Sequence, residues 1–353
     1  MQEPPTSQDA PPRPAHAGAR PDLDLWRLGD LVTPMAVRTA ATLAVADHIL
    51  AGRSGADALA RATGVDAGAL GRVLDHLVTV GLLRYDDGAY ELTDRGAVLR
   101  SDHPSGMRHL WDLEGAVGRA DLSLVELPAV VATGSPGYPR RFGRGFWDDL
   151  AARPELARSF TAQMANVIAR DSPAIAAAYD WSALGSVVDV GGGSGELLAA
   201  LLTAHPTLRG TVLDLPGVAE EAKRTLGERD VDARADVVAG SFFDPLPAGA
   251  GGYVLSSVLH DWDDDACGAV LSRCAEAAGE DGRVFVIEQV GEDGRNPNTV
   301  MDLRMLTFFG GKERTLDELA GLAEHAGLAY VAAHPTAGQV AARSVIEFVP
   351  GTG

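Results

Sequence analysis

The sequence predicts an α/β protein whose doubly wound, largely parallel sheet is preceded by a helical domain of winged-helix type. After position 180, short β-branched runs alternate with helical stretches of about 10–15 residues, as in a parallel sheet with helices on both faces. Before position 105, apolar residues recur at helical spacing and end in a short hairpin. The 353 residues suffice for a sizeable core and a second, smaller domain.

The bulk composition argues against some classes of partner. The chain carries 49 acidic and 30 basic residues, a formal net charge of -19. Such an acidic surface repels phosphate backbones, so we expect no nucleic-acid partner, although a cationic ligand is compatible. No apolar run is as long as a membrane span, which predicts no membrane partner. The two cysteines, Cys267 and Cys274, fall on one predicted helix and suit buried packing in a reducing, cytoplasmic compartment.

The N-terminal part divides into a tail and a helical domain. Residues 1–21 are rich in proline, alanine and small polar residues, and we expect a disordered tail. Residues 22–105 have the rhythm of a winged helix: two helices meet around Gly64, and a hairpin turns at positions 87–88. The second of these helices places four apolar side chains on one face: Leu70, Val73, Leu74 and Leu77.

This winged-helix pattern allows a rival function, that of a DNA-binding regulator. Such a regulator needs a basic recognition helix. The candidate helix, 67–80, carries one arginine, Arg72, and one aspartate, Asp75. The pattern therefore favours a packing or dimerisation module.

The rest of the chain is expected to hold the ligand sites. Residues 106–180 look helical and aromatic, and we interpret them as a helical linker that contributes to a substrate pocket. Residues 181–353 form the predicted sheet domain. The expected strands are the runs SVVDV, GTVLDL, ADVVAG, YVLSSV, RVFVIEQV, LAYVAA and SVIEFV.

A glycine-rich loop, DVGGGSG from Asp189 to Gly195, follows the first of these strands and opens a helix. Glycines are required where a tight strand-to-helix turn brings the backbone close to a ligand. A dinucleotide fingerprint would need a further glycine where Glu196 stands. The loop therefore favours another ligand over a dinucleotide.

The next two strands also end in residues that suit an adenosine. Asp214 ends the second strand, where a carboxylate can accept hydrogen bonds from both ribose hydroxyls; the alternative is a helix-capping aspartate. Phe242 follows the third strand, where its ring can lie against an adenine. Three such features at successive strand ends predict a cofactor site at the carboxyl edge of the sheet.

The fourth strand runs directly into Leu259-His260-Asp261-Trp262, which places His260 at the same edge. A phenol with a pKa near 10 is mostly protonated at neutral pH, and a neutral imidazole within reach can remove its proton. The alternative is a histidine fixed by aspartates that cap the next helix, and we expect Asp261 and Asp263 to cap it.

Two glutamates follow in the sequence. Glu288 ends the fifth strand among apolar neighbours, where an unpaired carboxylate would be costly. We expect it to pair with Nδ1 of His260 and to fix the tautomer of the ring. Glu313, before a helix that Thr315 can cap, looks on its own like a surface residue.

Seven segments together resemble the plant-type small-molecule O-methyltransferases in order and spacing: VVDVGGGSG, LDLPG, GSFFDPLP, LHDWDDD, VIEQ, MDLRML and GGKERT. The bacterial branch that tailors anthracyclines, with carminomycin 4-O-methyltransferase-like enzymes, looks most similar, and DLVTPMAVRTAATLAVADHIL belongs to that similarity. The resemblance covers the chain after the tail. It implies a Rossmann-like methyltransferase fold, S-adenosyl-L-methionine as cofactor and an interlocked homodimer. The implied reaction is methyl transfer to a hydroxyl of a small aromatic substrate, with a phenolic hydroxyl as the first candidate.

The resemblance also implies roles for single residues. The catalytic residues are the base His260 and the flanking Glu288 and Glu313, and no metal is implied. The cofactor residues are Asp189, Gly191, Gly193, Gly195, Asp214, Leu215, Ser241, Phe242, Ser256 and, for the methionine carboxylate, Arg158. The substrate residues are Trp147, Phe160, Met164, Asp261, Asp302, Arg304, Met305 and Phe308, for each of which ordinary core packing is the alternative.

The chain departs from the family at one cofactor position. Ser241 stands where the family usually has an acid, so the adenine amino group is expected to be bound differently. Some anthracycline relatives lack the histidine and both glutamates, and a few decarboxylate or hydroxylate their substrates, a rival reaction on the same fold. This chain retains His260, Glu288 and Glu313, which favours methyl transfer.

Overall fold

The computed structural model describes residues 25–26, 28–290, 293–296, 298–337 and 343–351, so the tail predicted at 1–21 lies outside the described residues. Tertiary contacts divide the chain into two compact units, 1–97 and 98–353. Among the residues described, no helix has the length and apolar content that a membrane crossing needs.

The first unit has the predicted order of helices followed by a hairpin. Its elements are α2 (Val32–Thr42), α3 (Val45–Leu50), α4 (Ala56–Thr63), α5 (Ala67–Thr79), β1 (Leu83–Asp86) and β2 (Ala89–Leu92). The turn after α4 is made by Gly64, whose φ is 74°, and Asp87 and Gly88 turn the hairpin with φ of 45° and 82°. On α5, the side chains of Leu70, Leu74 and Leu77 are buried, and Val73 packs against them.

The second unit begins with helices that surround an aromatic cluster. They are α6 (Met107–Trp111), α7 (Ala116–Asp121), α8 (Leu127–Thr133), α9 (Gly137–Phe142), α10 (Phe146–Ala152) and the long α11 (Pro154–Ala177). These helices, which the sequence suggested as a linker, belong to the same compact unit as the sheet.

The sheet confirms the predicted fold class. Its strands are β3 (Ser186–Val190), β4 (Arg209–Asp214), β5 (Ala235–Ala239), β6 (Gly252–Ser256), β7 (Arg283–Glu288), β8 (Leu328–Pro335) and β9 (Ser344–Pro350). They lie in the order β5-β4-β3-β6-β7-β9-β8, with the first five parallel and with β9 antiparallel to both of its neighbours. Because the strand order reverses between β3 and β6, a ligand is expected at the carboxyl ends of these strands.

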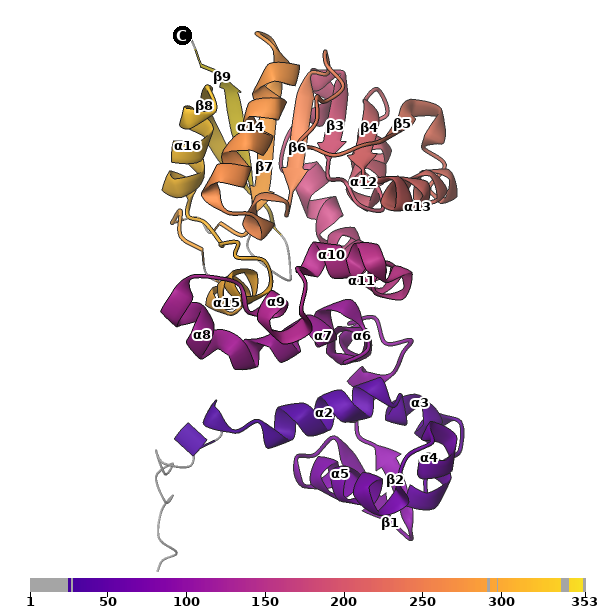
Figure 1. Cartoon of the computed structure of the whole chain (residues 1–353). Helices are drawn as coiled ribbons and strands as arrows, with labels where there is room; N and C mark the ends of the chain where they lie inside the picture. Colours follow the sequence, from indigo (N-terminus) through magenta and orange to yellow (C-terminus); the bar gives the residue numbers. More distant parts are fainter. Residues whose placement is uncertain (1–24, 27, 291–292, 297, 338–342, 352–353) are drawn as a thin grey trace, which may run out of the picture. The chain divides into compact units, whose positions relative to one another are not determined.

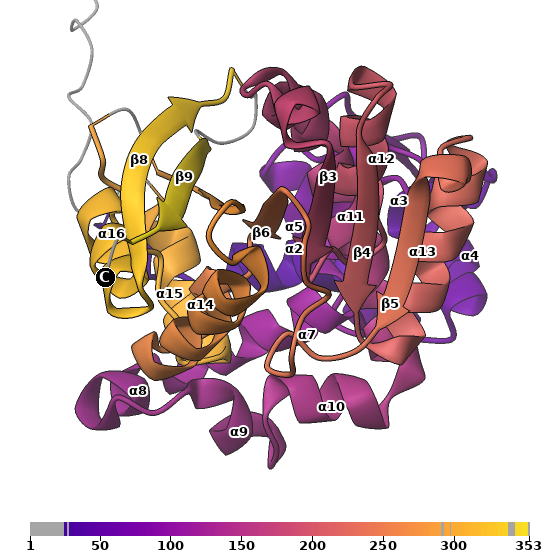
Figure 2. The same cartoon turned by 90° about the horizontal axis from the view of Figure 1, so that it is seen from above.

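Helices cover both faces of the sheet (Figure 2). Apolar residues of α14 (Asp264–Ala278) and α16 (Leu316–His325) pack on one face, and Cys267 and Cys274 are buried there as predicted. Residues of α12 (Glu196–Ala204), α13 (Pro216–Glu228) and the end of α11 pack on the other. Helices α9, α10 and α15 (Thr299–Phe308) lie beyond the carboxyl edge of β6 and β7 (Figure 1), and their side chains share one apolar cluster.

Candidate active site

The glycine loop joins β3 to α12 through left-handed residues. Gly191, Gly193 and Gly195 have φ of 71°, 59° and 79°, a region that residues with a Cβ enter only at a cost. The N–H of Gly193 donates to Asp214 Oδ2 at 2.8 Å, and the N–H of Leu215 donates to Asp214 Oδ1 at 2.7 Å. Asp214 therefore lies against the loop and does not cap α13.

A second carboxylate, Asp189, is buried at the end of β3. Within the described part of the chain, its Oδ2 has no hydrogen-bond partner. Burial and, second, the charge of Asp214 raise the pKa of Asp189 to about 7, and burial also raises the pKa of Asp214. Because an unpaired buried carboxylate is costly, this corner fits a ligand that brings hydrogen-bond donors or positive charge.

Two further predicted cofactor residues follow β5 and end β6. A Cβ built on Gly191 would lie 3.4 Å from ring atoms of Phe242, so this ring packs close to the glycine loop. Ser256, the last residue of β6, has a buried Oγ for which the described residues offer no partner. An orphaned hydroxyl beside the glycine loop is a second feature that a bound cofactor would satisfy.

Three other predicted cofactor residues are more accessible. Leu215 is exposed at the start of α13, and Ser241 is half-buried, its Oγ accepting from the N–H of Phe243 at 3.2 Å. Arg158 is exposed on the second turn of α11. Their cofactor contacts stay predictions.

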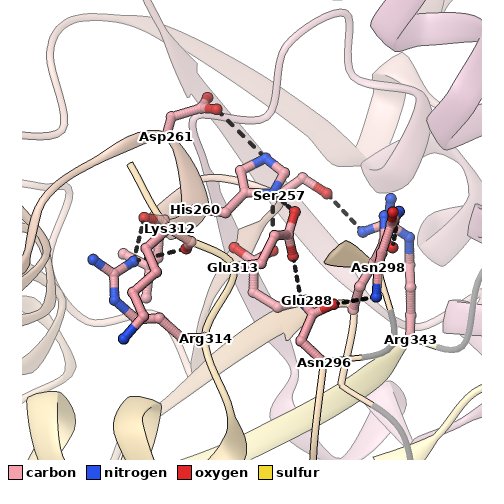
Figure 3. Close-up of polar contacts among 12 residues, drawn as sticks. Ser257, His260, Asp261, Glu288, Asn296, Asn298, Lys312, Glu313, Arg314 and Arg343 are labelled. Carbon is pink, nitrogen blue, oxygen red and sulfur yellow. Dashed lines mark hydrogen bonds and ion pairs between the residues drawn. The ribbon is translucent and has the colours of Figure 1, made fainter. Parts of the chain in front are cut away.

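The candidate base lies on a short turn after β6. Ser257 has a left-handed φ of 54°, which costs a residue with a Cβ about 1–3 kcal/mol. The chain then enters a 3-10 turn, Leu259–Asp261, which places His260 at the carboxyl edge with 14% of its side chain exposed. Its Nδ1 lies 3.0 Å from Glu313 Oε1 and 3.5 Å from Glu288 Oε2 (Figure 3).

Nδ1 of His260 pairs with both glutamates. It makes a hydrogen bond with Glu313 and lies at ion-pair distance from Glu288, so the predicted pairing with Glu288 is present but is shared with Glu313. Glu313 is only 5% exposed, so it is no surface residue. A backbone contact brings Glu313 to the ring: the N–H of Lys312, the residue before Glu313, donates to the carbonyl of His260 at 3.0 Å.

Glu288 contributes to the site through charge. It is 4% exposed, and neither of its carboxylate oxygens has a hydrogen-bond partner in the part of the chain that the structure describes. Burial raises the pKa of Glu288, and the charge of His260 opposes that rise. An imidazolium at His260 would therefore be stabilised by a carboxylate that lies 3.5 Å away.

Asp261 faces the other ring nitrogen. Its Oδ1 lies 3.5 Å from Nε2 of His260, and it does not cap the next helix, as the sequence had predicted. That cap is supplied by Asp263 alone, whose Oδ1 accepts from the N–H of Ala266 at 2.9 Å. Asp261 is prevented from capping because it lies inside the 3-10 turn.

The carboxylates determine the basicity of the ring. Burial alone would lower the pKa of His260, but the charges of Glu288, Asp261 and Glu313 outweigh burial and raise it to about 10. The carboxylates therefore make this ring a stronger base than a free imidazole, as removal of a proton from a phenolic acceptor requires.

Glu313 is itself held by two side chains. Its Oε2 accepts from Nδ2 of Asn296 at 2.6 Å, and its N–H donates to Asp302 Oδ1 at 3.0 Å. Asp302 is also a predicted substrate residue, and its contact with an acceptor stays a prediction. Sequence reasoning missed Asn296, which stands in a loop outside every recognised motif.

Substituting Glu313 by glutamine is expected to shift the pH dependence of kcat/KM. A base at His260 must be neutral to accept a proton, so activity is expected to rise with pH through the pKa of this histidine. Removing one of the charges that raise this pKa lowers it, and the rising limb should move to lower pH. A pH–rate profile measures the shift. The matched control is Glu318→Gln, five positions further on, whose carboxylate is hydrogen-bonded to Lys312 and Thr315. This control should leave the rising limb of the pH–rate profile in place. If the rising limb is also unmoved in Glu313→Gln, Glu313 does not raise the pKa of His260.

Aromatic rings gather beside the base, where the acceptor was predicted to bind. Trp147 stacks on Phe309 at 5.3 Å and lies parallel to Trp262 at 6.1 Å between ring centroids, and Phe160 meets it edge-on at 5.6 Å. The Nε1 of Trp147 is buried and has no partner within the described residues. The cluster thus offers flat apolar surfaces and one unsatisfied donor to a ring-shaped acceptor.

The remaining predicted pocket residues differ in their surroundings. Met305 and Phe308 are buried inside the aromatic cluster. Arg304 donates from Nε and Nη2 to Asp121 at 2.8 and 3.1 Å, and Met164 is partly exposed on α11. Their contacts with an acceptor stay predictions.

The three side chains predicted to be catalytic are also residue types that bind divalent cations. One ligand atom from each of His260, Glu288 and Glu313 lies within 4.8 Å of the others. However, Nδ1 of His260 is already engaged with Glu313 at hydrogen-bond distance. The metal-free site expected from the sequence stays a prediction.

Comparison with known proteins places this geometry in a family. A model of the O-methyltransferase domain matches residues 124–329, and one of the O-methyltransferase dimerisation domain matches 26–102. The chain is 57% identical, over 92% of its length and 96% of the relative's, to 2,7-dihydroxy-5-methyl-1-naphthoate 7-O-methyltransferase from Streptomyces carzinostaticus. It is 43% identical, over 93% and 90%, to aclacinomycin 10-hydroxylase from Streptomyces purpurascens.

A solved structure agrees with this similarity. It is an O-methyltransferase from neocarzinostatin biosynthesis in complex with S-adenosylmethionine and 2-hydroxy-5-methyl naphthoic acid. The two chains are 55% identical and superpose with a TM-score of 0.87 over 95% of this chain and 99% of the other.

Proposed function

The chain belongs to the S-adenosylmethionine-dependent O-methyltransferases, and from this premise we propose that it methylates a hydroxyl of a small aromatic polyketide, with hydroxynaphthoic acids as first candidates. The observation that carries the proposal is the hydrogen bond between His260 and Glu313 at the sheet edge that also carries the glycine loop. The naphthoate named for the 57% identical relative and the naphthoic acid bound in the similar structure support this acceptor class.

The cofactor corner of the chain suits a sulfonium compound, which supplies an electrophilic methyl group. Its backbone N–H groups and the carboxylate of Asp214 would bind and orient the adenosine. The buried Oδ2 of Asp189, which has no partner among the described residues, would accept a hydrogen bond from such a ligand. Holding the two reactants in line can contribute roughly 7–11 kcal/mol to lowering the barrier.

His260 moves the proton in this mechanism. The ring would accept the proton of the acceptor hydroxyl, while a bound sulfonium would supply the methyl group and leave as a thioether. Glu313 accepts from Nδ1–H, which fixes the tautomer and leaves Nε2 to face the acceptor. Glu288 and Asp261, each 3.5 Å from a ring nitrogen, stabilise the imidazolium that forms.

A second candidate function is hydroxylation or decarboxylation of a tailored polyketide with the same cofactor. The 43% identity to aclacinomycin 10-hydroxylase supports it. The buried base with its two glutamates favours methyl transfer, since a proton acceptor is what an oxygen nucleophile needs.

Product mass separates the two functions. We expect incubation with labelled S-adenosylmethionine and a panel of hydroxynaphthoates, anthracyclines and simple phenols to give a labelled product and S-adenosylhomocysteine. The product should be heavier by one methylene equivalent. An unlabelled product that has lost carbon dioxide or gained oxygen would overturn the proposal in favour of the second candidate.

We also infer a homodimer, a cytoplasmic location, and a functional division into 22–105, 106–180 and 181–353. The dimerisation-domain match supports the first of these. So do large apolar side chains that the first unit leaves exposed: Leu28, Leu31, Val32 and Met35. Buried free cysteines suit a reducing compartment.

A further inference from the structure

A buried ion pair lies beside the carboxyl ends of β6 and β7, and neither of its residues belongs to a motif of the cofactor or acceptor site. Arg343 directly precedes β9 and is 5% exposed. Its Nε donates to Oδ2 of Asp171, a buried residue of α11, at 2.8 Å. Burying both charges costs solvation, and such a pair is weak grounds for stability alone, which points to another role.

The first sign of that role is a contact with the turn that carries the base. Nη1 of Arg343 donates to Oγ of Ser257 at 2.7 Å (Figure 3). Ser257 is the left-handed residue that leads β6 into the turn of His260, and its N–H donates to the carbonyl of Ile287 at 3.0 Å. The guanidinium therefore holds a strained residue three positions before the base.

The second sign is the place of Arg343 next to Glu288. In the antiparallel pairing of β7 and β9, Ser344 stands opposite Glu288. The carbonyl of Arg343 accepts from the N–H and the hydroxyl of Thr336 at 2.8 and 3.1 Å, so the backbone of Arg343 is fixed. The charged groups that act on Glu288 are His260, Glu313 and Arg343, and Arg343 opposes the rise of its pKa caused by burial.

The third sign is the helix that carries Asp171. Phe160, Gln163, Val167 and Asp171 recur at three- and four-residue spacing and so share one face of α11. Phe160 belongs to the aromatic cluster beside Trp147. The same helix therefore connects the acceptor side of the site to the ion pair.

We propose that Arg343, held by Asp171, is a positioning residue for methyl transfer: it fixes Ser257, and through Ser257 the base, and it balances the charge beside Glu288. The inference rests on the proposed function of His260. It assigns to the pair no contact with cofactor or acceptor.

Two single variants and their combination test the proposal. Arg343→Met removes a positive charge and should raise the pKa of His260, whereas Asp171→Asn removes a negative charge and should lower it, each by about half a pH unit or more. The double variant should return this pKa close to the wild-type value. Its kcat should stay at least about tenfold reduced, because Ser257 has lost its partner. Nitrogen-15 NMR titration of the imidazole reads the pKa without turnover, so a failure here is distinct from a failure of the proposed reaction.

A matched arginine separates positioning from simple stability. Arg234 donates to carbonyls of Leu202, His205 and Leu208 at the amino edge of the sheet. Arg234→Met should lower the melting temperature and leave the pKa of His260 unchanged. If Arg343→Met and Asp171→Asn also lower the melting temperature and leave the pKa of His260 unchanged, the proposal is wrong. Should either fail to fold, Ser257→Ala removes only the hydroxyl and should lower kcat at least tenfold with KM little changed; an unchanged kcat would overturn the proposal.

Discussion

Replacing His260 by glutamine is expected to lower kcat by about 10²–10⁴-fold and to leave the affinity for S-adenosylmethionine unchanged. Glutamine has a similar reach and can still hydrogen-bond Glu313, but it cannot accept a proton from the acceptor hydroxyl. The residues predicted to bind the cofactor lie at the ends of β3 and β4, where Asp214 is held by the backbone, so cofactor binding should survive. Steady-state kinetics and calorimetric titration with the cofactor measure the two quantities separately.

The control for this variant is His325→Gln. His325 ends α16, is exposed, and its Nδ1 contacts the carbonyl of Gly321 at 2.6 Å. That substitution should change neither kcat nor cofactor affinity. If His260→Gln lowers kcat by less than about tenfold, alignment of the reactants accounts for the rate enhancement and the histidine is not the base.

Most of the fold could be predicted because its signals are local. Each expected strand is a short run with β-branched residues, and a strand of the structure overlaps each of these runs. The glycine loop and His260 could be placed for the same reason: each follows a strand directly, and parallel strands bring their carboxyl ends to one edge. The cap of α14 shows the limit of local reasoning, because the backbone geometry of the preceding 3-10 turn decides that Asp263 caps and Asp261 does not.

Contacts between distant segments could not be predicted in this way. Whether Glu313 is buried depends on a loop that packs under a histidine 53 positions earlier. Arg343 and Asp171 are separated by 172 positions, and neither stands in a recognised motif. The sequence around a charged residue does not show whether its side chain is solvent-exposed or buried in an ion pair. Only the three-dimensional structure distinguishes these two environments.

Substituting Gly311 by alanine is expected to lower kcat at least about 100-fold, because misplacing catalytic groups by about 1 Å can have that effect. A Cβ at this position would lie 2.1 Å from the carbonyl oxygen of His260 and 2.7 Å from the carbonyl carbon of Asp261. Both atoms belong to the backbone of the turn that carries His260, so the clash cannot be relieved by turning a side chain. We also expect a loss of about 1–3 kcal/mol in the free energy of unfolding, as for other overpacked sites.

The reason this effect should be large is that Gly311 lies where the turn of His260 meets the loop of Glu313. The next residue, Lys312, donates its N–H to the same carbonyl of His260, and the residue after it is Glu313. Moving the loop away would therefore lengthen the hydrogen bond between Glu313 and the base. Gly321→Ala, in α16 with no atom within 4 Å of the added Cβ, is the control and should stabilise the protein by about 0.4–1 kcal/mol without changing kcat. Kinetics measured well below the melting temperature separate the loss of kcat from the loss of stability. A Gly311→Ala variant with normal kcat would show that the turn of His260 does not depend on the close approach of Gly311.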